Sequence, residues 1–171
     1  MKSLIKRLSV VLLLVPAVAS SVNASETCEW IRVAPVGAGF SIMMPAKRVE
    51  EVNPRDDFTL HLFSVTTANK IYLAAYGDYA PSIRQDVARE LAANRDKFLN
   101  SVGAMLTDSR KITMDGHTGL KFTAESDPAS FKSRIFLFGN RVHQISVAVL
   151  DGKDDTKNID RFFASFSFSK P

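Results

Sequence analysis

The stretch RIFLFGNRVHQISVAVL, residues 134–150, decides the fold. Two runs rich in aromatic and β-branched residues flank Gly139-Asn140, a dipeptide typical of a tight hairpin turn. Successive side chains of a strand point to opposite faces, so the second run brings four residues to one face. These residues are His143, Ile145, Val147 and Val149. The pattern predicts an antiparallel pair of strands with one buried face.

The same strand signals recur towards both ends of the chain. The expected strands are Trp30–Val33, Gly39–Met44, Phe58–Thr67, Ile71–Tyr79, Met105–Met114, Thr118–Ala124, Arg134–Phe138 and Val142–Leu150. The dipeptide Asp115-Gly116 predicts a tight turn between two of them. Residues 46–57 are expected to form a loop, because Asn53-Pro54 and many charges interrupt the pattern.

Two segments carry the spacing of amphipathic helices. The first is expected to begin at Pro81 and to end at Gly103, a plausible left-handed cap. Its apolar stripe consists of Ile83, Val87, Leu91, Phe98 and Val102. The second helix is expected from about Asp155, with a stripe of Ile159, Phe162, Phe163 and Phe166.

The order of these elements predicts the fold class. Two runs of strands, each followed by a helix, indicate an α+β domain with a mainly antiparallel sheet of about six to eight strands. One long helix and one short C-terminal helix are expected to cover the apolar faces of this sheet. No repeat or long Gly, Pro and Ser-rich tract divides the chain, so residues 25–171 are expected to form a single globular domain.

Residues 1–24 have the three-part pattern of a cleaved signal peptide. Lys2, Lys6 and Arg7 precede an apolar run, and Val22-Asn23-Ala24 supplies small residues for cleavage near Ala24. A membrane anchor is disfavoured, because Ser9, Pro16 and two further serines interrupt the run, whereas a spanning helix needs about 20 apolar residues. We therefore expect a periplasmic or secreted protein with no stable membrane anchor after cleavage.

Removal of the leader changes the charge of the protein. Loss of 24 of the 171 residues leaves 147, and the Lys and Arg count falls from 22 to 19 against 18 Asp and Glu. The net charge therefore falls from +4 to +1, and positive and negative side chains alternate along the mature chain. Nucleic-acid-binding domains concentrate basic residues on one face, so we expect no nucleic-acid partner.

Cys28 is the only cysteine and cannot form an internal disulfide. In an oxidising compartment it can either pair with another chain in an intermolecular disulfide or remain a mobile free thiol near the new N-terminus. Its surroundings in the sequence favour the free thiol, because no basic cluster or nearby histidine lowers the pKa of the sulfur.

The layout resembles small exported bacterial proteins with the α/β/α sandwich of the PsbP-like extrinsic photosystem proteins. The resemblance is carried by Gly39-Phe-Ser-Ile-Met-Met-Pro45, the helix after Pro81, the strand Arg141-Val-His-Gln-Ile145 and Asp160-Arg-Phe-Phe-Ala-Ser-Phe166. It implies the fold and a binding or assembly role in the envelope more than catalysis. No metal or partner-binding motif of those proteins matches residue by residue, so the resemblance implies no site.

The sequence contains none of the motifs that would identify an enzyme or a metal site. It has no Cys-x-x-Cys, His-Glu-x-x-His, phosphate loop or Gly-x-Ser-x-Gly. The acidic residues 151–155 lack the ligand spacing of a calcium loop and suit a solvated turn. We therefore expect no cofactor and no bound metal.

Five residues are candidates for a ligand or partner surface: Tyr72, Tyr76, Tyr79, His61 and His143. The tyrosines are expected to pack within half-buried strands or, alternatively, to line a ligand groove beside the long helix. His143 shares the apolar face of its strand and is expected to be a core histidine. His117, after the Asp115-Gly116 turn, is expected to be exposed.

The expected function is that of an exported, non-enzymatic module that binds an envelope protein partner or a small ligand. The alternative is a small exported hydrolase or metal-dependent enzyme. It would use His61, His117 or His143 with Asp127 or Asp78, and it requires a histidine within hydrogen-bond reach of a carboxylate or of a second histidine in a cleft.

Overall fold

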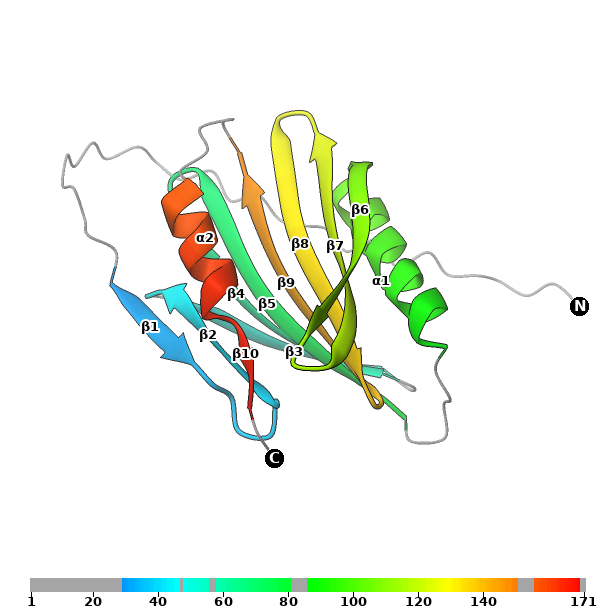
Figure 1. Cartoon of the computed structure of the whole chain (residues 1–171). Helices are drawn as coiled ribbons and strands as arrows, with labels where there is room; N and C mark the ends of the chain where they lie inside the picture. The colour runs from blue at the N-terminus through cyan, green and yellow to red at the C-terminus, as the bar shows by residue number, and fades with distance from the viewer. Residues whose placement is uncertain (1–28, 47, 56–57, 81–85, 151–155, 170–171) are drawn as a thin grey trace, which may run out of the picture.

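The computed structural model describes residues 29–46, 48–55, 58–80, 86–150 and 156–169. The first five strands are β1 Trp30–Val33, β2 Phe40–Pro45, β3 Val49–Arg55, β4 Phe58–Thr66 and β5 Lys70–Tyr79. Helix α1, Val87–Val102, follows them. The remaining elements are β6 Met105–Met114, β7 His117–Ser126, β8 Ala129–Phe138, β9 Arg141–Val149, α2 Thr156–Ser165 and β10 Ser167–Phe168 (Figure 1).

Several predictions concern residues outside these ranges. They are the signal peptide at residues 1–24, Cys28, the helix start at Pro81 and Ile83, and the turn at residues 151–155. Neither helix of the described residues has the length and apolar character needed to cross a membrane.

Seven strands form one antiparallel sheet in the order β3-β4-β5-β9-β8-β7-β6. The two runs of strands meet where β5 pairs with β9, so that Tyr76 lies opposite His143 and Asp78 opposite Arg141. Strands β1, β2 and β10 form a separate three-stranded sheet in the order β1-β2-β10. The α+β class with mainly antiparallel strands is confirmed, but the strands are divided between two sheets instead of one.

The hairpin predicted from residues 134–150 is confirmed as β8 and β9. Phe138 pairs with Arg141 across the turn, and the pairing continues to Ser130 and Val149. His143, Ile145, Val147 and Val149 are all buried, as their alternation predicts. The turn at Asp115-Gly116 is also confirmed, since both residues have the positive φ angles that such a turn requires.

The prediction of a loop at residues 46–57 is wrong. Residues Val49–Arg55 form β3, which pairs with β4 along its whole length. Pro54 cannot donate to a ladder, but β3 is an edge strand and has one side without a partner strand in the described sheet. The charged residues that suggested a loop, Glu50 and Glu51, are exposed, as is common on a protected sheet edge.

Helix α1 begins later than the sequence predicts. Asp86 has an extended backbone, and its side chain accepts a hydrogen bond from the Arg89 N–H at 3.0 Å, which caps a helix starting at Val87. Gly103 closes the helix in the left-handed conformation, as predicted. Leu91 and Leu99 are buried, and Phe98 and Val102 of the expected stripe pack partly buried against the same core, whereas Val87 is 40% exposed.

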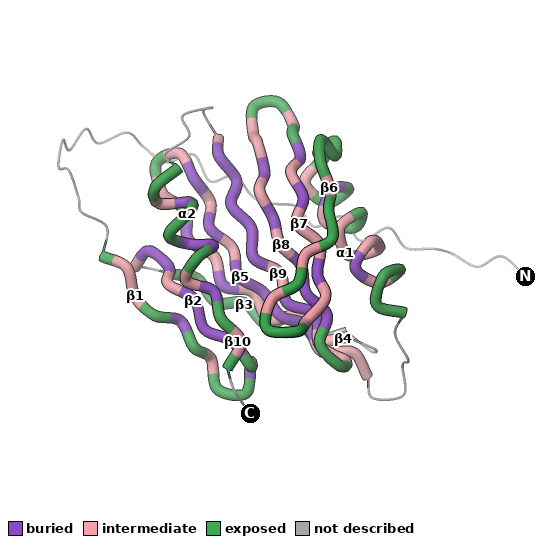
Figure 2. Tube along the Cα trace, viewed as in Figure 1, coloured by how far each residue is buried: buried purple, intermediate pink, exposed green. Residues whose placement is uncertain are grey.

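Two hydrophobic cores lie on opposite faces of the seven-stranded sheet. The first core joins α2 and the three-stranded sheet to residues such as Phe63, Ile145 and Val147. The second joins α1 to residues such as Phe122, Ile135 and Leu137. Adjacent residues of β8 and β9 alternate between the two cores, and the central strands are therefore buried from both sides (Figure 2).

Candidate functional site

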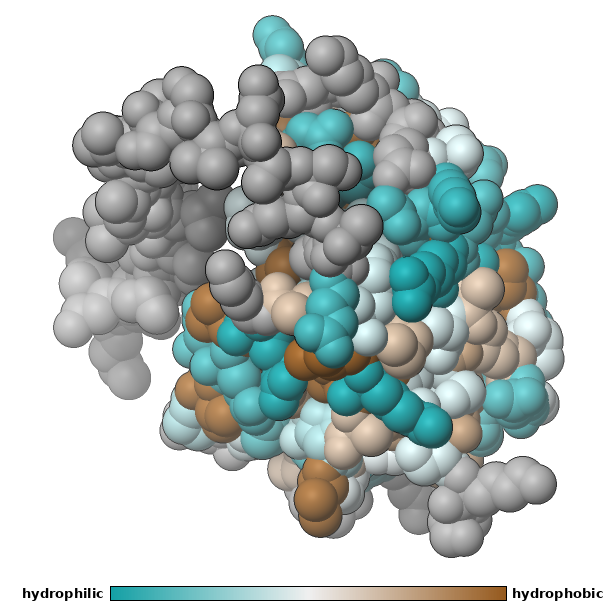
Figure 3. All heavy atoms as spheres, turned by 90° about the vertical axis from the view of Figure 1, so that its left-hand side faces the viewer, coloured by the Kyte–Doolittle hydropathy of each residue, from teal (hydrophilic) through white to brown (hydrophobic). Residues whose placement is uncertain are grey.

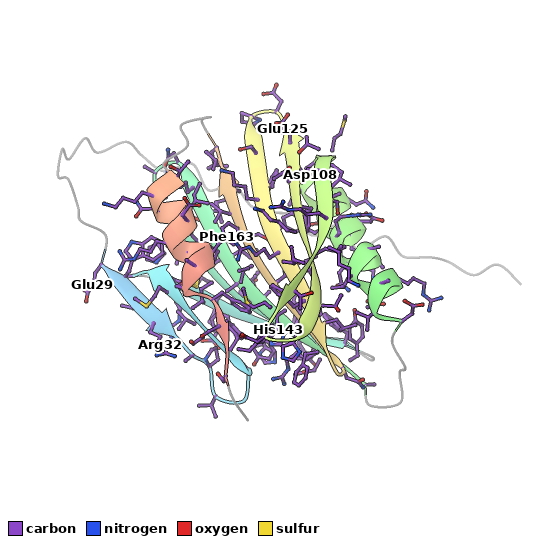
Figure 4. All side chains as sticks on the ribbon, viewed as in Figure 1. Glu29, Arg32, Asp108, Glu125, His143 and Phe163 are labelled. Carbon is purple, nitrogen blue, oxygen red and sulfur yellow. The ribbon has the colours of Figure 1, made fainter. Side chains whose placement is uncertain are left out.

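A pocket of about 590 Å³, here called the end pocket, opens at the end of the two sheets where several turns meet. It is lined by Pro35, Gly37 and Gly39 of the β1–β2 turn, Asp78 of β5, His117 of β7, Phe138 and Asn140 at the β8–β9 turn, Arg141 and His143 of β9, and Phe168 and Ser169 at β10. Figure 4 places His143 at this end of the molecule.

The β1–β2 turn owes its shape to its glycines. Gly37 and Gly39 both have φ of 75°, a conformation that side chains with a Cβ rarely adopt. The Ala38 N–H donates to the Pro35 carbonyl at 3.1 Å and closes the turn. The turn is tied to the main sheet because Arg141 donates from Nη1 to the Gly37 carbonyl. The wall of the end pocket is thus fixed from both sheets.

Arg141 and Asp78 form the charged pair of the end pocket. The Arg141 Nε and Nη2 atoms donate to the two carboxylate oxygens of Asp78 at 2.5 and 2.8 Å, a two-point geometry that fits a guanidinium and a carboxylate. The hydrogen bond to Asp78 raises the pKa of Arg141, and burial opposes this effect. Arg141 therefore stays charged and held in place, with its charge matched by Asp78.

Tyr76 connects this pair to His61. The Cζ atom of Arg141 lies 4.9 Å from the centroid of the Tyr76 ring, a cation–π contact from the β9 side. From the β4 side, His61 stacks on Tyr76 with centroids 4.3 Å apart and planes 3° apart. The three side chains form a layered row across β4, β5 and β9. Burial of the Tyr76 hydroxyl raises its pKa, and the charge of Arg141 opposes the shift.

His143 is buried at the inner side of the end pocket. Its Nε2 atom lies 3.0 Å from the Ala38 carbonyl, which can only accept, so Nε2 carries the proton. Burial lowers the pKa of His143 to about 4, and the imidazole is therefore neutral at pH 7. Its Nδ1 atom is buried without a hydrogen-bond partner among the described residues. His143 is a core histidine, as predicted, but only one of its two nitrogens is satisfied.

Aromatic rings form the outer wall of the end pocket. The His117 ring lies 4.3 Å from that of Phe138 and 4.7 Å from that of Phe168, measured between centroids. His117 is half-buried, whereas it was expected to be exposed, because these two rings enclose it. Phe138 itself is 56% exposed and presents apolar surface to solvent beside the pocket.

A second hollow of about 450 Å³, here called the arginine hollow, adjoins the end pocket and shares Pro35 with it. It lies beside β1, β3 and β4, and its polar lining residues are Arg32, Arg48, Glu50, His61 and Tyr76. Arg32 donates from Nη2 to the Ser41 hydroxyl at 2.9 Å. Figure 3, which views the side that carries β1, shows hydrophobic side chains among hydrophilic ones at the lower end of this face.

The three tyrosines do not line one groove beside the long helix, and two of them, Tyr72 and Tyr76, are packed in a hydrophobic core. Tyr72 is buried on the α2 side, where its ring lies 5.3 Å from that of Phe162. The ring of Tyr76 is on the same side, near Phe40. Only Tyr79 faces α1, where its hydroxyl donates to Glu90 and accepts from Asn94 at 3.1 Å.

A groove of about 440 Å³ does lie beside α1, and it is lined mainly by aliphatic side chains of the sheet. Leu60, Leu62 and Leu73 form its floor, and Phe98 and Val102 of α1 form one side. Of the three tyrosines, Tyr76 alone is among the residues that line this groove, although its ring lies on the other side of the sheet near Phe40.

The part of the chain that the structure describes does not form the geometry required for the enzyme alternative. Among the described residues, no histidine forms a hydrogen bond with a carboxylate or with another histidine. His117, His143 and Asp78 do line the same pocket, but the Asp78 carboxylate accepts hydrogen bonds from Arg141 and not from a histidine. Asp127 lies in the β7–β8 turn, at the end of β7 and β8 opposite to the end pocket (Figure 1). No three His, Cys, Asp or Glu side chains of the described part of the chain come together as metal ligands.

No family model matches the chain. No curated protein matches it either. Among solved structures, the chain is similar to cyanobacterial PsbP (CyanoP) from Synechocystis sp. PCC 6803, with a TM-score of 0.60 and 12% sequence identity, over 88% of this chain and 98% of that chain. The chain has a PsbP-like fold.

A crystal structure from Bacteroides thetaiotaomicron has 15% identity and a TM-score of 0.41, over 81% of this chain and 48% of that chain. At 12% identity, the similarity to CyanoP shows the fold alone and assigns no residue to a function. The end pocket must be interpreted from its own chemistry.

Sequence reasoning singled out His61, His143 and Tyr76 but missed Arg141, Phe138 and Phe168 as parts of the site. Arg141 is one of many charged residues, and only the pairing of β5 with β9 brings it to Asp78. Phe138 and Asn140 flank the predicted Gly139 turn, and that turn was the signal that could have pointed to an exposed aromatic residue.

Proposed function

We propose that this protein is an exported, non-enzymatic binding or assembly module of the cell envelope, and that it engages a protein partner through the end pocket. Residues 1–24 would direct export and be removed near Ala24. In this proposal the domain is an α/β/α sandwich-like frame that presents turns from both sheets at one end.

The observation that carries the proposal is the exposed aromatic wall of the end pocket. Phe138 is 56% exposed beside a cavity of about 590 Å³, and Arg141 and Asp78 hold polar groups in fixed positions within the same cavity. A concave, mainly apolar pocket with a few oriented polar groups is the usual form of a small-molecule site, and the anchor side chains of protein partners fill desolvated pockets at interfaces. The extrinsic PsbP-like fold is compatible with such a role.

The test is site-specific photo-crosslinking in intact cells that produce the full chain. A photoreactive phenylalanine analogue at Phe138 is expected to crosslink a discrete partner. The matched control carries the analogue at Phe131, an aromatic residue in the same strand whose side chain is buried on the α1 side. A partner captured equally from both positions, or from neither, would refute the proposed site.

Export is tested separately by fractionation and by mass spectrometry of the purified protein. The expected result is a mature chain that begins near residue 25 and is recovered from the periplasm or the medium. Recovery of the uncleaved chain in the cytoplasm would refute this part of the proposal.

A further inference from the structure

We infer that the partner segment of the end pocket carries a bulky apolar side chain and, within a few residues of it, an acidic side chain. The inference rests on the proposed function and specifies the chemistry of its partner. It is drawn from two neighbouring features of the surface, the aromatic wall of the end pocket and the arginine hollow.

The apolar part of the inference comes from the turns around the end pocket. Phe138 at the end of β8 is 56% exposed, and Val36 in the β1–β2 turn is fully exposed. Phe138 lines the end pocket and is held against the ring of His117, whereas Val36 lines the adjoining arginine hollow. Removal of such apolar surface from water favours association. A side chain within the pocket would contact Phe138, but covering Val36 as well requires a longer chain segment.

The charge balance of the end pocket favours an uncharged anchor. The Arg141 guanidinium is matched by the Asp78 carboxylate, and it also donates to the Gly37 carbonyl. The His143 imidazole is neutral because burial lowers its pKa to about 4. A charged anchor would lose its hydration in this pocket without a free opposite charge to replace it.

The arginine hollow has the opposite character. Arg32 and Arg48 both line it, and neither forms an ion pair with a carboxylate of the described residues. Glu50 is the one carboxylate in its lining, so the hollow has an excess of positive charge. Charge complementarity therefore favours an acidic group on the partner.

The two features are close enough for one short segment to reach both. They share Pro35, and Tyr76 of the arginine hollow lies 4.9 Å from the Arg141 Cζ atom of the end pocket. An extended chain advances about 3.3 Å per residue, so a segment of a few residues is long enough to reach from one feature into the other.

A protein segment fits these features better than a membrane surface. A bilayer would contact the exposed turns but would leave the concave pocket unfilled. The side chain of an extended segment fills the pocket while its backbone passes over the turns.

The test uses the full mature protein, labelled with ¹⁵N, and three blocked pentapeptides. The first is Gly-Trp-Gly-Asp-Gly, the second has Ala in place of Trp, and the third has Lys in place of Asp. We expect the first peptide to shift the backbone amide signals of Gly37, Gly39 and Phe138. Replacement of Trp should weaken binding about tenfold or more, and replacement of Asp by Lys about threefold.

A charge-reversal variant checks which arginines discriminate between the peptides. In the double variant Arg32→Glu and Arg48→Glu, the preference for the Asp peptide over the Lys peptide is expected to reverse. The matched control is Arg89→Glu on the exposed side of α1, which should leave the preference unchanged. Equal binding of all three peptides, or an unchanged preference in the double variant, would overturn the inference.

The remaining outcomes separate this inference from the proposed function. If crosslinking at Phe138 captures a partner but the peptides show no preference, the proposed function stands and the inference fails. If the peptides bind as expected but crosslinking captures nothing, the chemistry of the surface stands and the proposed function fails. Sedimentation with phosphatidylglycerol vesicles that requires Phe138 and Arg32, with no peptide binding, would assign the surface to a membrane and overturn the inference.

Discussion

Arg141 and Asp78 join β9 to β5 by two hydrogen bonds between one guanidinium and one carboxylate, although 63 positions separate them in the sequence. Their side chains are 27% and 41% exposed, so solvent screens much of their attraction. Arg141 has two further contacts, with the Gly37 carbonyl and the Tyr76 ring. Arg141 should therefore contribute more to the free energy of unfolding than its ion pair alone.

Loss of Arg141 should destabilise the protein more than loss of the Asp78 charge. Arg141→Ala removes the ion pair, the tie to the β1–β2 turn and the ring contact, and it should lower the free energy of unfolding by about 2 kcal/mol. Asp78→Asn keeps the shape of the side chain and should cost about 1 kcal/mol or less. Urea denaturation of both variants measures the difference.

The control for this comparison is Asp96→Asn. Asp96 pairs with Arg95 on the exposed side of α1 and should contribute almost nothing. If Asp78→Asn cost as much as Arg141→Ala, the contacts of Arg141 with the turn and with Tyr76 would have no measurable value.

His143 should make the protein less stable as the pH falls from about 6.5 to about 4. Burial is the main cause of its lowered pKa, which is about 4 in the folded state against 6.5 for the free side chain. Between these values the unfolded state binds more protons, so protonation favours unfolding. The full shift corresponds to about 3 kcal/mol of stability, present above pH 6.5 and lost below pH 4.

The measurement compares urea denaturation of the wild type and of His143→Gln between pH 4 and pH 7. Carboxylates also titrate in this range, and the contribution of His143 is therefore the difference between the two pH profiles. His117→Gln, in the same pocket, is the matched control. If the stability of His143→Gln fell with pH as steeply as that of the wild type, His143 would not be the group that causes the loss of stability.

The predictable part of the fold depended on local signals. Turn dipeptides such as Gly139-Asn140 and Asp115-Gly116, with period-two alternation, located two hairpins of the main sheet. The strand β3 was missed because its charged residues and Pro54 suit a loop, and only its position at the edge of a sheet makes them compatible with a strand.

The site was less predictable because it depends on contacts between distant segments. Period-two alternation already separates Tyr79 from Tyr76, since residues three positions apart in a strand face opposite sides. The alternation alone therefore argues against the alternative of a single groove lined by all three tyrosines. The approach of Arg141 to Asp78 and of Phe168 to His117 depends on strand pairings that no local pattern specifies.

Tyr79 should anchor α1 to the sheet through its hydroxyl. The hydroxyl donates to the Glu90 carboxylate and accepts from Asn94, and burial and the hydrogen bond to Glu90 raise the pKa of Tyr79 to about 12. Tyr79→Phe removes both hydrogen bonds and should lower the free energy of unfolding by about 1–2 kcal/mol. Tyr76→Phe is the control, because the structure gives its hydroxyl no hydrogen bond to the described residues. Equal losses in the two variants would argue against an anchoring role.

Two glycines in strands should differ sharply in their tolerance of a methyl group. A Cβ at Gly119 would lie 2.4 Å from the Ile135 carbonyl oxygen, which belongs to the backbone of the adjacent strand and cannot move independently. A Cβ at Gly77 would lie 2.0 Å from the Phe58 ring, a half-buried side chain that can rotate away. Gly119→Ala should therefore cost about 3 kcal/mol, and Gly77→Ala about 1–2 kcal/mol.

Thermal and urea unfolding of the two variants measure these costs, and two further variants establish their cause. Gly103→Ala has no atom within 4 Å of the added Cβ but must keep a φ of 64°, and it should cost about 1 kcal/mol from backbone strain alone. Adding Phe58→Ala should make the Gly77→Ala change nearly neutral, because the ring that it meets is then absent. A Gly119→Ala variant as stable as the wild type would mean that β7 and β8 separate at this position more easily than their close approach implies.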